Sequence, residues 1–104
     1  MANKAHVAVV RRLNERYGNG ADNSNGFDVH IGDLVIEVET SATLHDGFQK
    51  LQGSGGRRYI AVTNQEAIDD AMALTKESPI GVMNPWGDIL RDAVPPEVSP
   101  AKSA

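Results

Sequence analysis

Apolar and polar residues alternate along two short stretches, residues 27–31 and 34–40, which lie on either side of Gly32 and Asp33. Such alternation is typical of β-strands that bury one face. A glycine at the first position of a two-residue loop is typical of a type II′ turn, because that turn requires a positive φ angle there. The pattern therefore predicts an antiparallel hairpin that turns at Gly32 and Asp33.

Counting outward from this turn predicts which residues face each other across the hairpin. One face pairs apolar residues throughout: Ile31 with Leu34, Val29 with Ile36, and Phe27 with Val38. The other face pairs His30 with Val35 and Asp28 with Glu37, and Glu39 follows two residues along. Carboxylates directly across from each other destabilise a sheet, so this register requires a compensating group. A bound divalent cation is the obvious candidate.

Helices are predicted at residues 3–17, 44–52 and 66–75, where apolar residues recur every three to four positions. Thr43 and Thr63, each followed three residues later by an acidic residue, are predicted to cap the second and third helices. Apolar runs predict buried strands at residues 57–63 and 80–83. A turn at residues 84–87 favours an edge strand near Ile89, with a short helix as the alternative. The order α-β-β-α-β-α-β predicts an α/β fold in which helices flank a mixed sheet.

Length and composition narrow the class of protein. At 104 residues, with a formal net charge of −4 and no cysteine, the chain fits one small domain without disulfides or Cys-based zinc sites. We expect this domain to span residues 1–94, and the Pro-, Ser- and Ala-rich residues 95–104 to form a disordered tail. Because no stretch reads as a secretory signal or a membrane span, the expected location is the cytoplasm. The negative charge argues against tight non-specific binding of DNA.

Three carboxylates are predicted to converge on the polar face of the hairpin. Glu37 and Glu39 alternate along one strand, roughly 6.6–7 Å apart, and Asp28 faces Glu37. A loose set of oxygen ligands suits Mg²⁺ or Mn²⁺. Such an ion polarises a phosphodiester and lowers the pKa of a bound water, so phosphodiester hydrolysis is the chemistry this arrangement favours.

The stretch FDVHIGDLVIEVET, the following helix, the RRYIAVT strand and the stretch PIGVMNPWGDI together resemble the PD-(D/E)XK nuclease superfamily. The resemblance covers residues 7–90. It implies a restriction-endonuclease-like sheet and a Mg²⁺-dependent endonuclease activity on DNA. By this resemblance, Asp28 matches the lone acidic metal ligand of the family and Glu37 matches the first residue of its (D/E)-x-K element.

One position departs from the family pattern, because Glu39 stands where the family usually has lysine. The resemblance implies two ways to retain activity. A few restriction endonucleases carry glutamate at this position, so Glu39 would serve as a further ligand or as a general base. In other members the following helix contributes a lysine or a glutamine, and the candidates here are Gln49, Lys50 and Gln52.

Other interpretations stay open at this stage. The same fold without the motif lysine could be an inactive module that binds nucleic acid or protein, and a generic α/β interaction protein with an acidic face is a weaker alternative. A nuclease with one active site would form a homodimer, or nick successively, to cut both strands of DNA, and RNA is an alternative substrate. His6 lies on the apolar stripe of the first helix, where a core or boundary role is favoured over a catalytic one.

Overall fold

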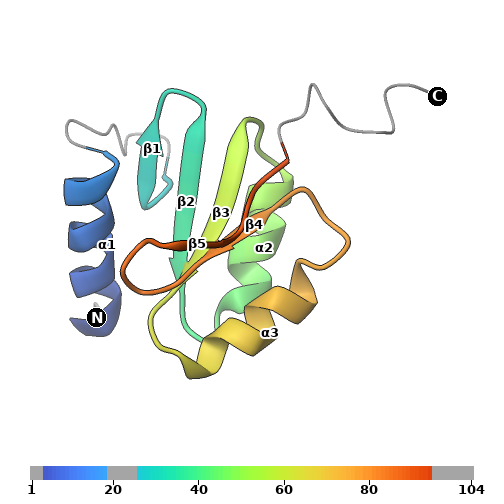
Figure 1. The fold of residues 1–104 in the computed structure, drawn as a ribbon. Helices are drawn as coiled ribbons and strands as arrows, with labels where there is room; N and C mark the ends of the chain where they lie inside the picture. The colour runs from blue at the N-terminus through green and yellow to red at the C-terminus, as the bar shows by residue number, and fades with distance from the viewer. Residues whose placement is uncertain (1–3, 19–25, 95–104) are drawn as a thin grey trace.

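A five-stranded mixed β-sheet forms the centre of the fold (Figure 1). The computed structural model describes residues 4–18 and 26–94. Across the sheet the strands follow in chain order: β1 (Val29–Ile31), β2 (Leu34–Glu39), β3 (Arg57–Val62), β4 (Gly81–Met83) and β5 (Ile89–Arg91). The inner pairs β2–β3 and β3–β4 are parallel, whereas each outer strand is antiparallel to its neighbour.

Helices cover both faces of this sheet, which gives three layers (Figure 1). The helices are α1 (Lys4–Arg16), α2 (Leu44–Gln52) and α3 (Glu66–Leu74). On one face α1 buries Leu13 in a cluster with Ile36. On the other face α2 and α3 bury Leu51 and Ala71 in a second cluster with Val35. Both α2 and α3 connect parallel neighbours in the same direction across the sheet, so right-handed crossovers bring them to the same face.

The predicted α/β class and mixed sheet are confirmed, but the element order differs. The structure has the additional strand β5 near Ile89, so the edge strand is confirmed and the alternative of a short helix is wrong. The predicted threonine caps are also wrong. Thr43 precedes α2 without a side-chain bond to the helix, and α3 begins after Gln65, where Asn64 Oδ1 accepts the N–H of Ala67 at 2.9 Å.

The hairpin follows the predicted register over the length of β1. The pairs are Val29–Ile36, His30–Val35 and Ile31–Leu34, and Gly32 has a φ angle of 59°. The two further predicted pairs are wrong, because β1 begins at Val29. Val38 donates its N–H to the carboxylate of Asp28 at 2.8 Å, and Phe27 packs against the cluster beneath α2 and α3. The polypeptide therefore leaves the plane of the sheet just before Val29.

Basic residues of α1 hold the loop between β4 and β5. Arg12 donates to the carbonyl of Pro85 at 2.6 Å, and Arg16 donates to the carbonyl of Trp86 and to the carboxylate of Asp88, both at 2.8 Å. Just beyond α1, Tyr17 completes the connection through its hydroxyl, which donates to the carbonyl of Gly87 at 2.5 Å. These contacts attach the first helix to the final pair of strands.

Two expectations fall on residues that the structure does not describe. The proposed tail at residues 95–104 and most of the loop after α1, residues 19–25, lie outside the described residues. Among the residues that are described, no helix combines the length and the apolar character needed to cross a bilayer.

The close approach of Gly56 to the hairpin turn generates a test of the fold. Gly56 has a φ angle of 85°, and a Cβ atom there would lie 3.1 Å from the carbonyl carbon of Asp33 and closer still to its oxygen. We expect Gly56→Ala to lower the free energy of unfolding by about 2–4 kcal/mol, through backbone strain and overlap. Chemical denaturation measures this change. Gly55→Ala is the matched control, because a Cβ at Gly55 meets nothing within 4 Å; equal stability of the two variants would contradict the expectation.

Candidate metal centre

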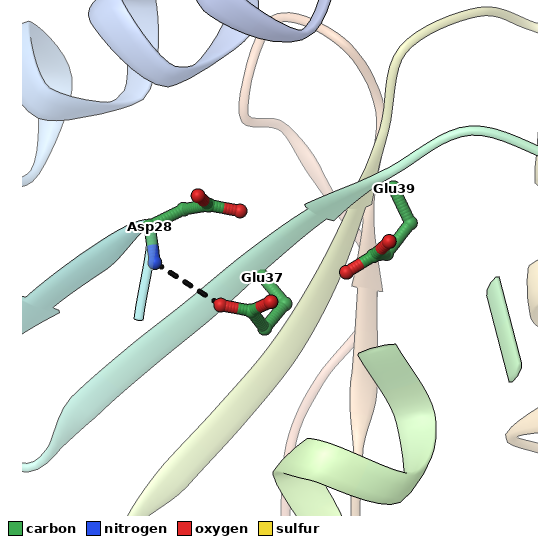
Figure 2. A group of neighbouring side chains, drawn as sticks. All are labelled: Asp28, Glu37 and Glu39. Carbon is green, nitrogen blue, oxygen red and sulfur yellow. Dashed lines mark hydrogen bonds between the residues drawn. The ribbon is translucent and has the colours of Figure 1, made fainter. Parts of the chain in front are cut away.

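Three carboxylates converge where β1 begins beside β2, as the sequence predicts (Figure 2). Asp28, Glu37 and Glu39 each offer an oxygen, and these atoms all lie within 4.8 Å of one another. Glu37 and Glu39 point from alternate positions of β2 toward the side covered by α2, and they are only 6% and 8% exposed. Burial distinguishes this cluster from a hydrated acidic surface.

Backbone N–H groups satisfy two of these carboxylates. Because β1 begins one residue after Asp28, the N–H of Asp28 donates to Glu37 Oε1 at 3.1 Å, and the N–H of Val38 donates to Asp28 Oδ2 at 2.8 Å. Asp28 and Glu37 are therefore close without being a cross-strand pair. These backbone hydrogen bonds stabilise the negative charge of the two carboxylates, which the sequence analysis expects a cation to do alone.

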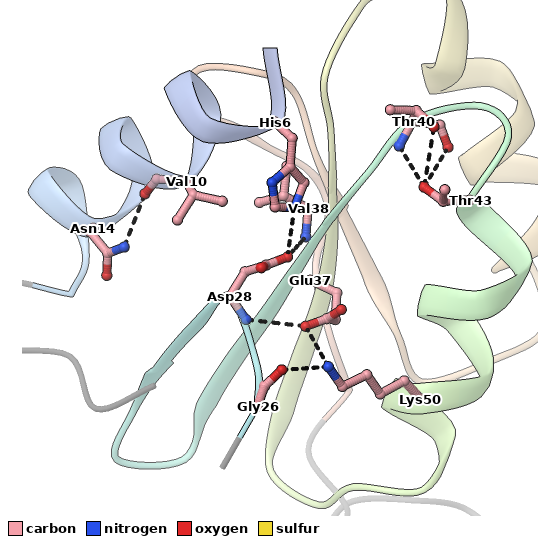
Figure 3. Close-up of polar contacts among 10 residues, drawn as sticks. All are labelled: His6, Val10, Asn14, Gly26, Asp28, Glu37, Val38, Thr40, Thr43 and Lys50. Carbon is pink, nitrogen blue, oxygen red and sulfur yellow. Dashed lines mark hydrogen bonds and ion pairs between the residues drawn. The ribbon is translucent and has the colours of Figure 1, made fainter. Parts of the chain in front are cut away.

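Two basic side chains contact the carboxylates from opposite layers of the fold (Figure 3). Lys50, on α2, places Nζ 3.5 Å from Glu37 Oε1 and also donates a short hydrogen bond to the carbonyl of Gly26. His6, on α1, places Nε2 3.2 Å from Asp28 Oδ2. Of the three residues suggested on α2, Lys50 is the one that contacts the carboxylates.

The other two residues suggested on α2 lie away from the cluster. Gln49 and Gln52 are exposed, and neither makes a hydrogen bond to the three carboxylates within the described chain. His6 contacts the cluster although its sequence position favours a core or boundary role. Its side chain is one-third exposed, which fits the boundary position expected of it. His6 lies on the stripe of α1 that faces the sheet, and this position is the feature of the sequence that could have predicted its contact with Asp28.

Gly47 makes room for Glu39 beneath α2. A Cβ atom at this buried position would lie 2.5 Å from both Cγ and Cδ of Glu39, well inside contact distance. Glycine within a helix costs about 1 kcal/mol relative to alanine. Here the missing side chain lets the helix pass directly over the glutamate.

Burial and like charge raise the pKa values of both glutamates. Burial is the main cause for Glu37, followed by the negative charge of Asp28. Burial also raises the pKa of Glu39 to about 7, with a smaller contribution from the charge of Glu37, while a hydrogen bond from Thr43 opposes the rise. At neutral pH the carboxyl of Glu39 can therefore both accept and release a proton.

Comparisons of the chain with protein-family models, with curated proteins and with solved structures give no match. The donor set is consequently the evidence for the class of ligand. Three carboxylate oxygens without a thiolate suit a hard cation such as Mg²⁺ or Mn²⁺. Asp28, Glu37 and Glu39 are the residues that would hold it.

The raised pKa values predict that stability falls as pH rises when metal is absent. The folded protein binds a proton at Glu39 up to a pH of about 7, whereas the unfolded chain releases it near 4.5. The contribution of this group is therefore complete below pH 4.5 and is lost as pH increases through 7. We expect a loss on the order of 1–3 kcal/mol between these limits. Denaturation in EDTA across the range measures it, and Glu39→Gln should flatten the slope; an unchanged slope in that variant would refute the assignment.

Gly47→Ala should weaken metal binding even though alanine favours the helix. The added methyl group would displace Glu39, so we expect the Kd for Mn²⁺, measured by calorimetry, to rise about 10-fold, which corresponds to about 1.4 kcal/mol. A second change, Glu39→Asp, shortens the side chain and should recover part of the affinity. Gly53→Ala is the control, because the nearest atom to a Cβ there lies 3.6 Å away. Wild-type affinity in Gly47→Ala would show that Glu39 is not a ligand.

Proposed function

We propose that this chain is a Mg²⁺- or Mn²⁺-dependent nuclease domain of the PD-(D/E)XK type that hydrolyses phosphodiester bonds of DNA. The convergence of Asp28, Glu37 and Glu39 within 4.8 Å supports the proposal most directly. The position of Lys50 beside Glu37 adds to that support, because the family resemblance assigns a lysine to this kind of site. Residues 4–18 and 26–94 hold one such centre, so cutting both strands would require a homodimer or two successive nicks.

Hydrolysis of a phosphodiester joins a water oxygen to phosphorus and breaks one P–O ester bond. The products are a phosphomonoester and an alcohol. The attacking water loses one proton and the leaving oxygen gains one, so the step is balanced. A bound divalent ion supplies Lewis acidity toward the phosphate and lowers the pKa of water. Asp28 and Glu37 would hold the ion, and the ammonium group of Lys50 would counter negative charge on the substrate.

Glu39 has two roles compatible with its position. Its oxygen lies within the ligand cluster, so it can complete the coordination of the ion. Its pKa of about 7 in the metal-free protein also suits a group that takes a proton from the attacking water at neutral pH. Either role would compensate for the lysine that the family usually has at this position.

The second candidate function keeps the fold and the metal site without catalysis. The glutamate at position 39 and the hydrogen bond that holds Lys50 on the carbonyl of Gly26 both favour this alternative. Under it the domain would bind nucleic acid or another protein, and the carboxylates would serve binding alone.

Cleavage of supercoiled plasmid in Mg²⁺ or Mn²⁺ tests the proposal. Wild type should nick the plasmid, Asp28→Asn and Glu37→Gln should lower the rate at least about 100-fold, and Lys50→Met should lower it about 10-fold or more. Asp70→Asn, an exposed acid on α3, is the matched control. Equal nicking by every variant would indicate contamination, and a parallel assay on single-stranded RNA tests the alternative substrate.

Thermal unfolding separates the two candidate functions. A metal at about ten times its Kd adds about 1.4 kcal/mol of stability, or about 5–10 °C in Tm for a domain of this size. This shift should vanish in Glu37→Gln. A shift without cleavage would favour the inactive module, and the absence of both would contradict the metal site itself.

A further inference from the structure

A recess of about 380 Å³ lies where the loop between β4 and β5 reaches α1 and the loop after β3 (Figure 1). Residues from all three segments line it, among them Ala8 and Arg12 of α1, Thr63 and Gln65 after β3, and Trp86 between β4 and β5. The volume is in the range of ordinary small-ligand sites, about 300–1,000 Å³.

The recess lies at the same end of the sheet as the metal centre. Because β2, β3 and β4 run parallel, their carboxyl ends follow one another along one edge. Glu39 is the last residue of β2, and Thr63, directly after β3, donates its N–H to the carbonyl of Glu39 at 3.1 Å. Ligands of open α/β sheets bind outside these strand ends. A ligand that extends from the metal centre along this edge would reach the recess.

Trp86 gives the recess an aromatic wall that is open to solvent. Its side chain is 51% exposed, although the loop that carries it is firmly held. Asn84 Oδ1 accepts the N–H groups of Trp86 and Asp88 at 2.9 and 3.0 Å. The guanidinium of Arg12 donates to the carbonyl of Pro85 and lies 5.7 Å from the centre of an indole ring. An aromatic ring fixed in this way loses little conformational entropy when a flat ligand packs against it.

The groups beside the indole are suited to the polar edge of a nucleobase. The side chains of Thr63 and Gln65 make no hydrogen bond with any other described residue, and Asn64 accepts the N–H of Ala67 through Oδ1 alone. Their hydroxyl and amide groups both donate and accept hydrogen bonds. Arg12 is the one charged residue among the described residues of the lining, so an anionic strand meets positive charge here. Aromatic, amide and guanidinium groups together are typical of sites for unpaired bases.

We propose, on the basis of the nuclease function above, that this recess binds the base of an unpaired nucleotide in the strand that the metal centre cuts. The base stacks on Trp86, and its edge bonds to the groups of residues 63–65. Neighbouring bases cover both faces of a base in a duplex, so a base must leave the stack to reach the indole. The preferred substrate is therefore a single strand or an unpaired end of DNA. No particular base is required, because stacking is tolerant of sequence.

The fluorescence of Trp86 tests this inference without relying on cleavage, because the chain has no other tryptophan. Oligothymidine added in Ca²⁺, another cation that oxygen ligands bind, should quench the indole when a base stacks on it. An abasic oligomer of the same length and a blunt duplex should leave the fluorescence unchanged. By anisotropy of labelled probes, both should bind about 10-fold more weakly than oligothymidine. Absence of quenching by oligothymidine, or equal affinity for all three probes, would overturn the proposal.

Two kinds of variant locate the binding in the recess. Trp86→Ala should weaken the oligothymidine complex about 10-fold and leave the abasic complex unchanged, because only the contact with the base is lost. Trp86→Phe should recover part of the affinity. Ala8→Leu fills the recess from an exposed position of α1 and keeps the indole, so it should weaken the oligothymidine complex and its quenching.

Leu90→Ala is the matched control, because Leu90 is an exposed apolar residue of β5 that does not line the recess. It should bind all probes as wild type does. An equal loss with Trp86→Ala on both oligomers, or wild-type binding by Ala8→Leu, would show that the base does not enter the recess.

The outcomes also separate this inference from the nuclease proposal. Base-dependent quenching that Ala8→Leu removes, without cleavage in Mg²⁺ or Mn²⁺, would support the recess and reject catalysis. Metal-dependent cleavage by a protein whose binding ignores the base would support the nuclease and reject the recess.

Discussion

The burial of two glutamates on β2 is the constraint on which the rest of the site depends. This strand has a partner on each side and a helical layer on each face, so Glu37 and Glu39 cannot extend into bulk water. Burying a charge requires partners. The structure supplies them through the N–H of Asp28, the ammonium group of Lys50 and a proton retained at Glu39. A cation that replaces the proton would add charge compensation at the same place.

The fold could be predicted from sequence where the determining signals are local. A glycine with positive φ and the alternation around it predict the hairpin, and three pairs of its register are confirmed. The apolar helical stripes and the strand runs likewise predict the mixed sheet. The point where β1 begins could not be predicted, because it depends on whether Val38 finds a backbone or a side-chain acceptor. Because Val38 bonds to the side chain of Asp28, Asp28 lies outside β1 and Phe27 does not pair with Val38.

The site depends more heavily on contacts between distant parts of the chain. The sequence predicts the convergence of the three carboxylates correctly, but strand alternation accounts only for Glu37 and Glu39. Asp28 joins them through its hydrogen bond with the N–H of Val38 and not as the predicted cross-strand partner of Glu37. The contact of Lys50 with Glu37 does not follow from its helical position, because the long side chain brings its ammonium group over the ring of Phe27, 5.1 Å from the centroid, to make it. The same applies to His6, whose partner lies 22 residues away in another layer. Gly47 lacks any local signal, since its role is defined by the space that Glu39 occupies.

The attachment of α1 to the loop between β4 and β5 has a consequence for the order of assembly. Arg12, Arg16 and Tyr17 are made early in synthesis, but the carbonyl groups that hold them belong to residues 85–87. Before that loop is synthesised, α1 has its apolar stripe and the contact of His6 with Asp28 to hold it on the sheet. These three hydrogen bonds can therefore form only once nearly all of the described chain has been synthesised, although the helix itself comes first.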